Sequence, residues 1–451
     1  MKRFPGNNIK VSILLSSLFM MTIVAPCICI CAEVKGSPTE YTLSDLYQIA
    51  AKNAEEILVA HENLEIATED RKRALSVIIP RLTAFADYTD HRDTDATFPQ
   101  SLTYGVQLNQ SFTVNGRELT ALKIADDQIQ KNQLDLVNLK EEYLLGVASA
   151  YYGIWMAIKA LDISRADVKR LTRHKEAVRS RFDLGDVTKT AMTRASAELA
   201  GSASVLVKSE NDLKLARARL SRLVKLPPSF TLTEPECRRQ PISYDLHQAK
   251  QEALRDRSDL KALEAQTQAA QKQIKWAKGA FFPALSLEGK YFDLTSQWSE
   301  IDPVTGVDEF DADNIAINLQ LTFTLFDGGL RQADLRQAES RYRQAMLVQK
   351  SLEKEILLMV ESAFLDLVTL KSMLSSLEEQ LKFSQENYMA VTEQFAIGMS
   401  NSIDVMDANT LLVKAEREFS DARFRYLLAE LNLLRAKGSF MNHVNTMKVE
   451  Q

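Results

Sequence analysis

Between Asn314 and Gly329 the chain reads NIAINLQLTFTLFDGG. From Asn314 to Leu325 every odd-numbered residue is apolar and every even-numbered residue is polar or small. Because successive side chains of a strand point to opposite faces of its sheet, this pattern predicts a strand with one apolar and one polar face. Such alternation over about ten residues is typical of an outer-membrane barrel strand. It also fits a half-buried sheet in a soluble domain.

Three further segments alternate in the same way. Tyr104–Phe112 and Leu285–Tyr291 do so clearly, and Leu82–Tyr88 more weakly. If the strands span a membrane, we expect the lipid-facing side chains to be Val106, Leu108, Phe112, Ile315, Ile317, Leu319, Leu321 and Phe323. Four strands cannot close a barrel, which needs about eight, and open strand edges cannot lie in lipid. Spanning strands would therefore require at least two copies of the chain.

The chain also repeats itself. Pro80 matches Pro283 at an offset of 203 residues, and later pairs match at offsets up to 213. Most of the drift falls between Tyr88 and Tyr104, which predicts a longer surface loop in the second half. We divide the chain into a first repeat at 33–225, a proline-rich linker at 226–243, a second repeat at 244–438 and a C-terminal tail at 439–451.

Each repeat is expected to contain a helix, two strands, a very long helix and a further helix. The expected helices are 43–76, 117–181 and 189–224 in the first repeat, and 245–278, 330–394 and 402–437 in the second. A helix of about 65 residues would extend about 95 Å. Asn115 and Asp327 are expected to be the N-caps of the two long helices.

The two long helices carry a seven-residue repeat. Its positions are Leu122, Ile129, Leu136, Tyr143, Ala150 and Ala157 in the first, and Leu335, Tyr342, Gln349, Ile356, Ala363 and Leu370 in the second. This period predicts left-handed coiled-coil packing. An ordinary filament or stalk would show the same repeat, but it would not explain the strands.

Residues 1–32 have the features of a secretory signal peptide, with a basic start, an apolar stretch from Val11 to Val24 and a cleavage site near Ala32. An uncleaved membrane anchor and a lipoprotein modified at Cys27 are alternatives. Removing this segment leaves 52 basic and 60 acidic residues, a net charge of −8, and Cys237 as the one cysteine. These values argue against a disulfide scaffold and against a nucleic-acid partner.

The sequence contains no recognisable active site. The five histidines are scattered, and the chain has no HExxH, Walker, GxGxxG, GxSxG or CxxC motif. Gly328-Gly329 is interpreted as a turn before a helix and not as a phosphate-binding loop. We therefore expect no catalytic residue, no cofactor and no metal.

Taken together, these residues resemble the TolC-type outer-membrane efflux proteins, also called outer membrane factors. The resemblance rests on the ordered set of features seen twice, including the turn Phe326–Gly329 and the segments Phe395–Gly398 and Ile403–Ala408, and it covers about 41–438. It implies an α+β membrane protein: a homotrimer with a 12-stranded outer-membrane β-barrel and a long periplasmic α-barrel of coiled-coil helices. Such ducts are not enzymes. They contact outer-membrane lipid and work with a periplasmic adaptor (membrane fusion) protein and an inner-membrane RND or ABC transporter, in tripartite efflux pumps or type I secretion systems.

The resemblance also suggests functional residues. Asp404 and Asp407 match the aspartates that line the periplasmic gate of the family, and their spacing places both on one helix face. A position near a helix N-terminus, where acids are favoured, would equally explain Asp404. The adaptor-docking tips correspond to Leu184, Gly185, Asp186, Ile397, Gly398 and Met399. A tight reversal between two helices would also explain these glycines.

This chain departs from the family pattern where related proteins often carry a base that locks the closed gate. Met399 to Ser402 contains no basic residue, and Ala191 stands where an acid is common. The latch of the closed state is therefore expected to differ. Two other functions remain open from sequence: a secreted or periplasmic coiled-coil structural protein, and an enzyme or binding protein whose site has no known motif.

Overall fold

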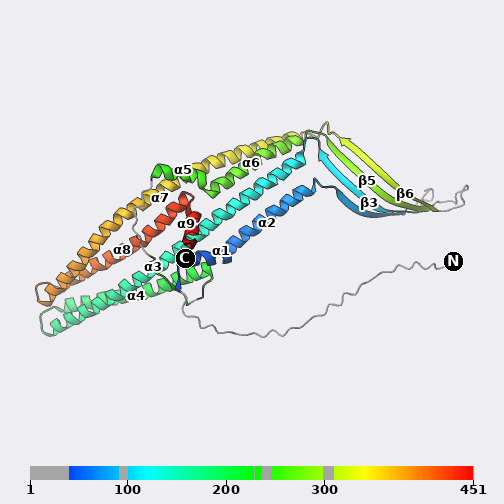
Figure 1. Cartoon of the computed structure of the whole chain (residues 1–451). Helices are drawn as coiled ribbons and strands as arrows, with labels where there is room; N and C mark the ends of the chain where they lie inside the picture. Colours follow the sequence, from blue (N-terminus) through cyan, green and yellow to red (C-terminus); the bar gives the residue numbers. More distant parts are fainter. Residues whose placement is uncertain (1–39, 91–99, 228, 236–244, 298–308, 450–451) are drawn as a thin grey trace, which may run out of the picture. The chain divides into compact units, whose positions relative to one another are not determined.

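Figure 1 shows a computed structural model that describes residues 40–90, 100–227, 229–235, 245–297 and 309–449. The expected signal peptide, Cys27 and Cys237 lie outside the described residues, as do the two loops that were compared for length. Glu40 to Gln451 forms one compact unit.

From their first helix onward, the two repeats contain the same elements in the same order, and the first helix expected in each repeat is divided in two, at Ala54 and at Arg257. The first holds β1 Glu40–Tyr41, α1 Leu43–Asn53, α2 Glu55–Ser76, β2 Arg81–Asp90, β3 Gln100–Thr113, α3 Arg117–Asp183 and α4 Lys189–Val224. The second follows β4 Thr231–Leu232 and holds α5 Leu246–Asp256, α6 Ser258–Gly279, β5 Ala284–Gln297, β6 Glu309–Thr322, α7 Leu330–Ala396 and α8 Ser402–Ala436. α9 Phe440–Val449 lies where we expected only a tail. Internal duplication is therefore a property of the fold.

The long helices α3 and α7 are both 67 residues long. Each extends two residues beyond the end expected from sequence. Every position of the predicted seven-residue repeat is buried or half-buried, and on α3 the same spacing continues through the buried Ser164, Leu171 and Val178. The expectation of coiled-coil packing is thus confirmed within the chain, where α3 packs on α4 and α7 packs on α8.

The four long strands form one antiparallel sheet in the order β2-β3-β5-β6. The two repeats meet at its centre, where β3 pairs with β5. Opposite residues share a face, and the register sets Val106 beside Tyr291 and Ile315, and Phe112 beside Leu285 and Leu321. One face is accordingly apolar. Gln107, Glu288 and Lys290 belong to the other, where the Gln107 amide donates to Glu288 at 2.8 Å.

β6, which contains most of the alternating segment from Asn314 to Leu325, ends earlier than the alternation predicts. β6 stops at Thr322, which pairs with Ala284, so Phe323 lies just beyond the strand. The residue that would pair with Phe323 is Pro283, which has no N–H to donate to the ladder. The Pro283 carbonyl instead accepts from the Val114 N–H at 3.1 Å.

The N-caps of the two long helices also differ from the expectation. Gly116 and Gly329 occupy these positions, with φ of 71° and 90°. Asp327 acts from outside the helix: its carboxylate accepts from the Gly329 and Arg331 N–H groups, each at 3.1 Å. No side chain caps α3 at Gly116.

The main core lies around the middle of α3. Leu144, Val147 and Tyr151 pack there with buried residues of α1, α4, α8 and α9. The segment expected to be a simple linker is also partly structured, since β4 pairs with β1 in parallel and Leu226 and Phe230 are buried in this core.

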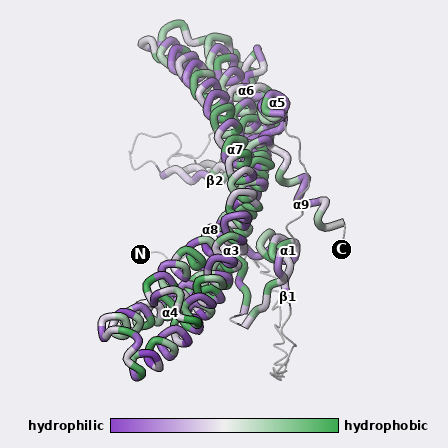
Figure 2. Tube along the Cα trace, turned by 90° about the vertical axis from the view of Figure 1, so that its left-hand side faces the viewer, coloured by the Kyte–Doolittle hydropathy of each residue, from purple (hydrophilic) through white to green (hydrophobic). Residues whose placement is uncertain are grey.

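By length and composition alone, one described helix, α3, contains a window apolar enough to cross a membrane. The window has a mean hydropathy of 1.4, and 44% of it is buried in the protein. Figure 2 shows hydrophilic and hydrophobic residues interleaved along α3, α4 and α8. In this structure the apolar window of α3 serves as core.

Candidate functional site: the two helical tips

Each repeat reverses direction once between its two coiled-coil helices. α3 leads to α4 through residues 184–188, and α7 leads to α8 through residues 397–401. Gly185 and Gly398 both have φ of 83°, a region that costs side-chain-bearing residues about 1–2 kcal/mol. The predicted docking residues therefore lie in two equivalent turns, and their side chains are open to solvent, with Leu184 77%, Ile397 72% and Met399 76% exposed.

The two tips lie at the same end of the helices and share a small core. Val178 of α3, Ala195 of α4, Phe395 of α7 and Val405 of α8 form this cluster. The two long helices and the two helices that follow the turns thus meet within a few turns of the reversals. The turns are positioned by packing between the repeats.

His174 of α3 lies beside this cluster. Its Nε2 is 2.9 Å from the Oγ of Ser402, the first residue of α8, and its ring lies 5.3 Å from that of Phe395. The imidazole is 7% exposed. Burial lowers the pKa of His174, and the hydrogen bond to Ser402 acts in the opposite direction. A neutral histidine therefore joins α3 to both α7 and α8.

Arg181 makes a second connection, one heptad further along α3. Its Nη2 donates to the Ala396 carbonyl at 2.9 Å, and its guanidinium lies 4.3 Å from the centre of the Phe395 ring. The carbonyl belongs to the last turn of α7, where a cation is favoured by the helix dipole. A base from the first repeat thus contacts the second tip, which has none of its own between Met399 and Ser402.

The two candidate gate aspartates have different surroundings. Asn401 caps α8, and the Asp404 carboxylate completes a capping box by accepting from the Asn401 N–H at 3.0 Å and from Ser400 Oγ at 3.1 Å. Asp407 lies one turn later with its side chain 69% exposed. Its nearest cation is Arg194 of α4, whose Nη2 is 3.9 Å from its Oδ1. Asp407 is therefore the freer of the two carboxylates.

The predicted lipid-facing residues other than Phe323 lie together on the apolar face of the sheet. Those in β6 are the most exposed, with Ile315 71% and Ile317 76% exposed. Phe323 is 51% exposed but follows the strand, as described above. In the described part of the chain, β2 and β6 each have one edge without a partner strand.

Sequence reasoning did not identify His174, Arg181 or Arg194. His174 and Arg181 lie seven residues apart on one stripe of α3. Each follows an apolar position of the seven-residue repeat by three residues, and this spacing was the signal that could have indicated them. Their partners belong to the other repeat and could not be deduced from spacing. Among the described residues no group of three His, Cys, Asp or Glu is arranged to hold a metal ion.

Comparison with known proteins agrees with this arrangement. Residues 46–224 and 249–439 match the family described as outer membrane efflux protein. The outer membrane protein TolC of Escherichia coli (strain K12) is 25% identical over 416 residues, covering 88% of this chain and 82% of TolC. The alkaline protease secretion protein AprF of Pseudomonas aeruginosa is 22% identical over 410 residues, covering 86% of this chain and 82% of AprF.

The fold comparison gives the same result. The solved structure of the outer-membrane channel OprN superimposes with a TM-score of 0.77 at 20% identity, covering 88% of this chain and 90% of that one. The family match extends over both repeats and includes both tips. The chain is therefore an outer-membrane protein that belongs to the outer membrane efflux protein family.

Proposed function

We propose that three copies of this chain form a passive exit duct from the periplasm to the exterior. Their twelve strands would close one outer-membrane β-barrel, and their helices would continue it as an α-barrel in the periplasm. The duct itself would catalyse no reaction, and the energy for export would come from an inner-membrane transporter.

The sheet is the observation that carries this proposal. It has four strands, two free edges and an exposed apolar face. Free edges and apolar faces of this size favour association, and in lipid every strand must be paired. Three copies are the number that the family resemblance implies, and they would pair each β2 with the β6 of the next copy.

The periplasmic end would contain the gate. Three copies of Asp407, with Asp404 one turn away, would place six carboxylates near the axis, a ring that favours cations. Because Asp404 already caps α8, Asp407 would supply most of the effect on ion passage. The exposed turn residues at Leu184–Asp186 and Ile397–Met399 would receive the periplasmic adaptor, which connects the duct to an RND or ABC transporter.

Single-channel recording in planar bilayers tests the duct and the gate together. The wild type would be compared with Asp407→Asn, Asp404→Asn and the control Asp162→Asn. Asp162 is an exposed carboxylate on α3, away from the helical tips. We expect small, cation-preferring and mostly closed currents from the wild type. Asp407→Asn should enlarge them and weaken the cation preference, Asp404→Asn should do so less, and the control should change neither.

The outcomes separate the alternatives. Pores with the same current in all four proteins would keep the duct and refute the aspartate gate. A soluble, elongated protein that forms no pore would favour the coiled-coil structural role instead.

A further inference from the structure

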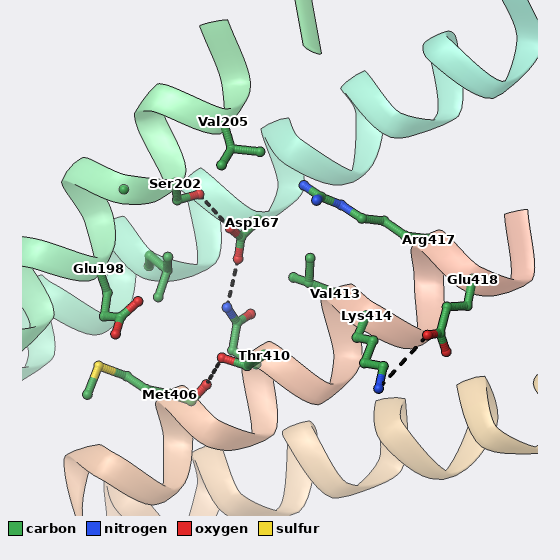
Figure 3. Close-up of a pocket in the computed structure, with 13 residues that line it drawn as sticks. Asp167, Glu198, Ser202, Val205, Met406, Thr410, Val413, Lys414, Arg417 and Glu418 are labelled. Atoms are coloured by element: carbon green, nitrogen blue, oxygen red, sulfur yellow. Dashed lines mark hydrogen bonds and ion pairs between the residues drawn. The ribbon is translucent and has the colours of Figure 1, made fainter. Parts of the chain in front are cut away.

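Above the tip, a chain of polar side chains crosses three helices that otherwise pack through apolar contacts. Asp167 of α3 accepts from Ser202 of α4 through one oxygen and from the Asn409 amide of α8 through the other, the latter at 2.7 Å. Figure 3 shows Asp167 between Ser202 and the helix that carries Met406 and Thr410. One carboxylate thus connects α4 to α8.

A second crossing lies further along the same helices. Ser164 of α3 is 3.0 Å from Ser209 of α4 and accepts from Arg417 of α8 at 3.3 Å. Positions 202 and 209 on α4 are one heptad apart, and positions 167 and 164 on α3 are one turn apart. The same connection, from α4 through α3 to α8, is therefore made twice.

Arg170 adds a further connection between α3 and α8, next to the first crossing. Its Nε donates to the side-chain amide oxygen (Oδ1) of Asn409 at 2.9 Å, and its two terminal nitrogens donate to the two oxygens of Glu416 at 3.2 and 3.0 Å. A fork of this kind fixes the relative orientation of two groups as well as their distance. We call these eight residues the α3 clamp: Ser164, Asp167, Arg170, Ser202, Ser209, Asn409, Glu416 and Arg417.

The clamp holds α8 where little else connects it to α4. A cavity of about 530 Å³ lies between the two helices, and Asp167, Ser202 and Asn409 are part of its lining. The ion pair of Lys414 and Glu418, at 3.9 Å beside the same cavity, stays within α8. Polar contacts through α3 therefore determine how α8 sits at this level.

The clamp holds α8 close to the candidate gate residue. Asn409 follows Asp407 by two residues, which corresponds to about 200° around a helix. Asn409 is 5% exposed, whereas the Asp407 side chain is 69% exposed on the opposite side. Both ends of the Asn409 amide are used, so a rotation or a sliding movement of α8 would break both bonds.

We propose that the α3 clamp is the latch of the closed channel: it fixes the rotation and axial position of α8, holds Asp407 at the constriction, and must break before the channel opens. This inference rests on the proposed duct function. The clamp residues are positioning residues, since none of them touches the permeating ion. They would replace the missing base of the second tip by contacts made higher on the seam between the repeats.

Open probability in planar bilayers tests the proposal. Asn409→Ala and Asp167→Ala leave buried polar groups without their partners, and we expect each to raise the open-to-closed ratio about tenfold. Asp167→Asn should stay near the wild type, because an amide can accept from Asn409 and donate to Ser202. Arg170→Lys cannot keep the fork on Glu416 together with the bond to Asn409, so it should give an intermediate value.

The control is Lys414→Ala, which borders the same cavity but removes only the contact within α8. Heat dissociation of the trimer would be measured for every variant, and if Asn409→Ala does not assemble, the comparison of Asp167→Asn with Arg170→Lys decides. Opening in Asn409→Ala and Asp167→Ala, with Asp167→Asn near the wild type and ion selectivity unchanged, supports the proposal. Equal opening in Lys414→Ala, or wild-type open probability in all clamp variants, would overturn it.

Failure of the clamp can be told from failure of the duct. If the clamp variants behave as wild type while Asp407→Asn changes selectivity, the duct stands and the clamp alone is wrong. If the wild type forms no pore, both proposals fail.

Discussion

Asp404 and Asp407 are one helical turn apart on α8 but make different contacts. Asp404 completes the capping box with Asn401, whereas Asp407 faces solvent near Arg194. We expect Asp404→Ala to lower the stability of the tip by about 0.5–1 kcal/mol, because it removes an acceptor and a negative charge from the first turn. Asp407→Ala should leave stability unchanged within error.

Hydrogen exchange of the amides from Ile403 to Met406 would measure this difference. Faster exchange in Asp404→Ala alone would assign the cap to Asp404. Equal exchange in both variants would show that the hydrogen bonds seen at Asp404 contribute nothing measurable.

Gly398 occupies the left-handed region at φ 83°, with no atom within 4 Å of the position of an added Cβ. Gly398→Ala should therefore destabilise the turn through backbone strain alone, by about 1 kcal/mol or more. Gly146 of α3, which also has open space around it, is a matched control in which alanine should stabilise the helix by about 0.5–1 kcal/mol. Thermal melts of the two variants should thus shift in opposite directions, and a shared direction would contradict the argument.

What the sequence could not predict at this scale depends on local turn geometry and on pairing across the sheet. Spacing alone placed Asp404 and Asp407 on one face, and their different partners come from the turn geometry. Asn115 was expected as an N-cap by residue preference, but a glycine in the left-handed region takes that position. Phe323 continues the alternation of β6. Its partner across the sheet would be Pro283, which has no N–H to donate, so the strand ends at Thr322.

At the scale of elements, His174 links the tip of one repeat to the tip of the other. Burial holds its pKa below the ordinary value, so the folded protein binds this proton less readily than the unfolded chain. The stabilisation is present above the ordinary histidine pKa of about 6.5 and is lost as pH falls through the lowered folded value. Acid should therefore weaken the contact of α3 with α7 and α8.

His174→Gln keeps a hydrogen-bonding group toward Ser402 and removes the titration. We expect the wild type to lose more stability than this variant between about pH 7 and pH 5. The comparison is made as a difference, because the buried Glu141 and the half-buried Glu430 have raised pKa values and act in the opposite direction in both proteins. Parallel pH profiles of stability for the two proteins would rule out His174 as the group responsible.

Element existence and length were the most predictable part of this fold. The seven-residue repeat located α3 and α7 within two residues of their ends, because coiled-coil packing repeats along the whole helix. β1, β4 and α9 were not predicted, nor were the breaks at Ala54 and Arg257. β4 has only two residues and depends on pairing with β1, and α9 is held by burying Phe440 and Val444 in the main core.

At the scale of the whole molecule, the two faces of the sheet make opposite predictions for neighbouring residues. Ile317 and Asn318 are adjacent in β6, and the register sets Ile317 on the apolar face and Asn318 on the polar face. If the apolar face contacts lipid, Ile317→Arg should cost about 2–4 kcal/mol near the membrane midplane. Asn318→Arg introduces the same arginine side chain, but there it would face the water-filled lumen, so it should cost far less.

The measurement is the fraction of heat-dissociable trimer recovered from outer membranes for the two arginine variants. A strong loss for Ile317→Arg beside near-normal recovery for Asn318→Arg would support three copies closing one barrel with the apolar face outward. Equal recovery would mean that neither face contacts lipid. A loss confined to Asn318→Arg would mean that the sheet is inverted, with its polar face packed against protein. The two variants place arginine at adjacent positions whose side chains point to opposite faces of the sheet. General effects of arginine on synthesis or export are therefore the same in both and cancel in the comparison.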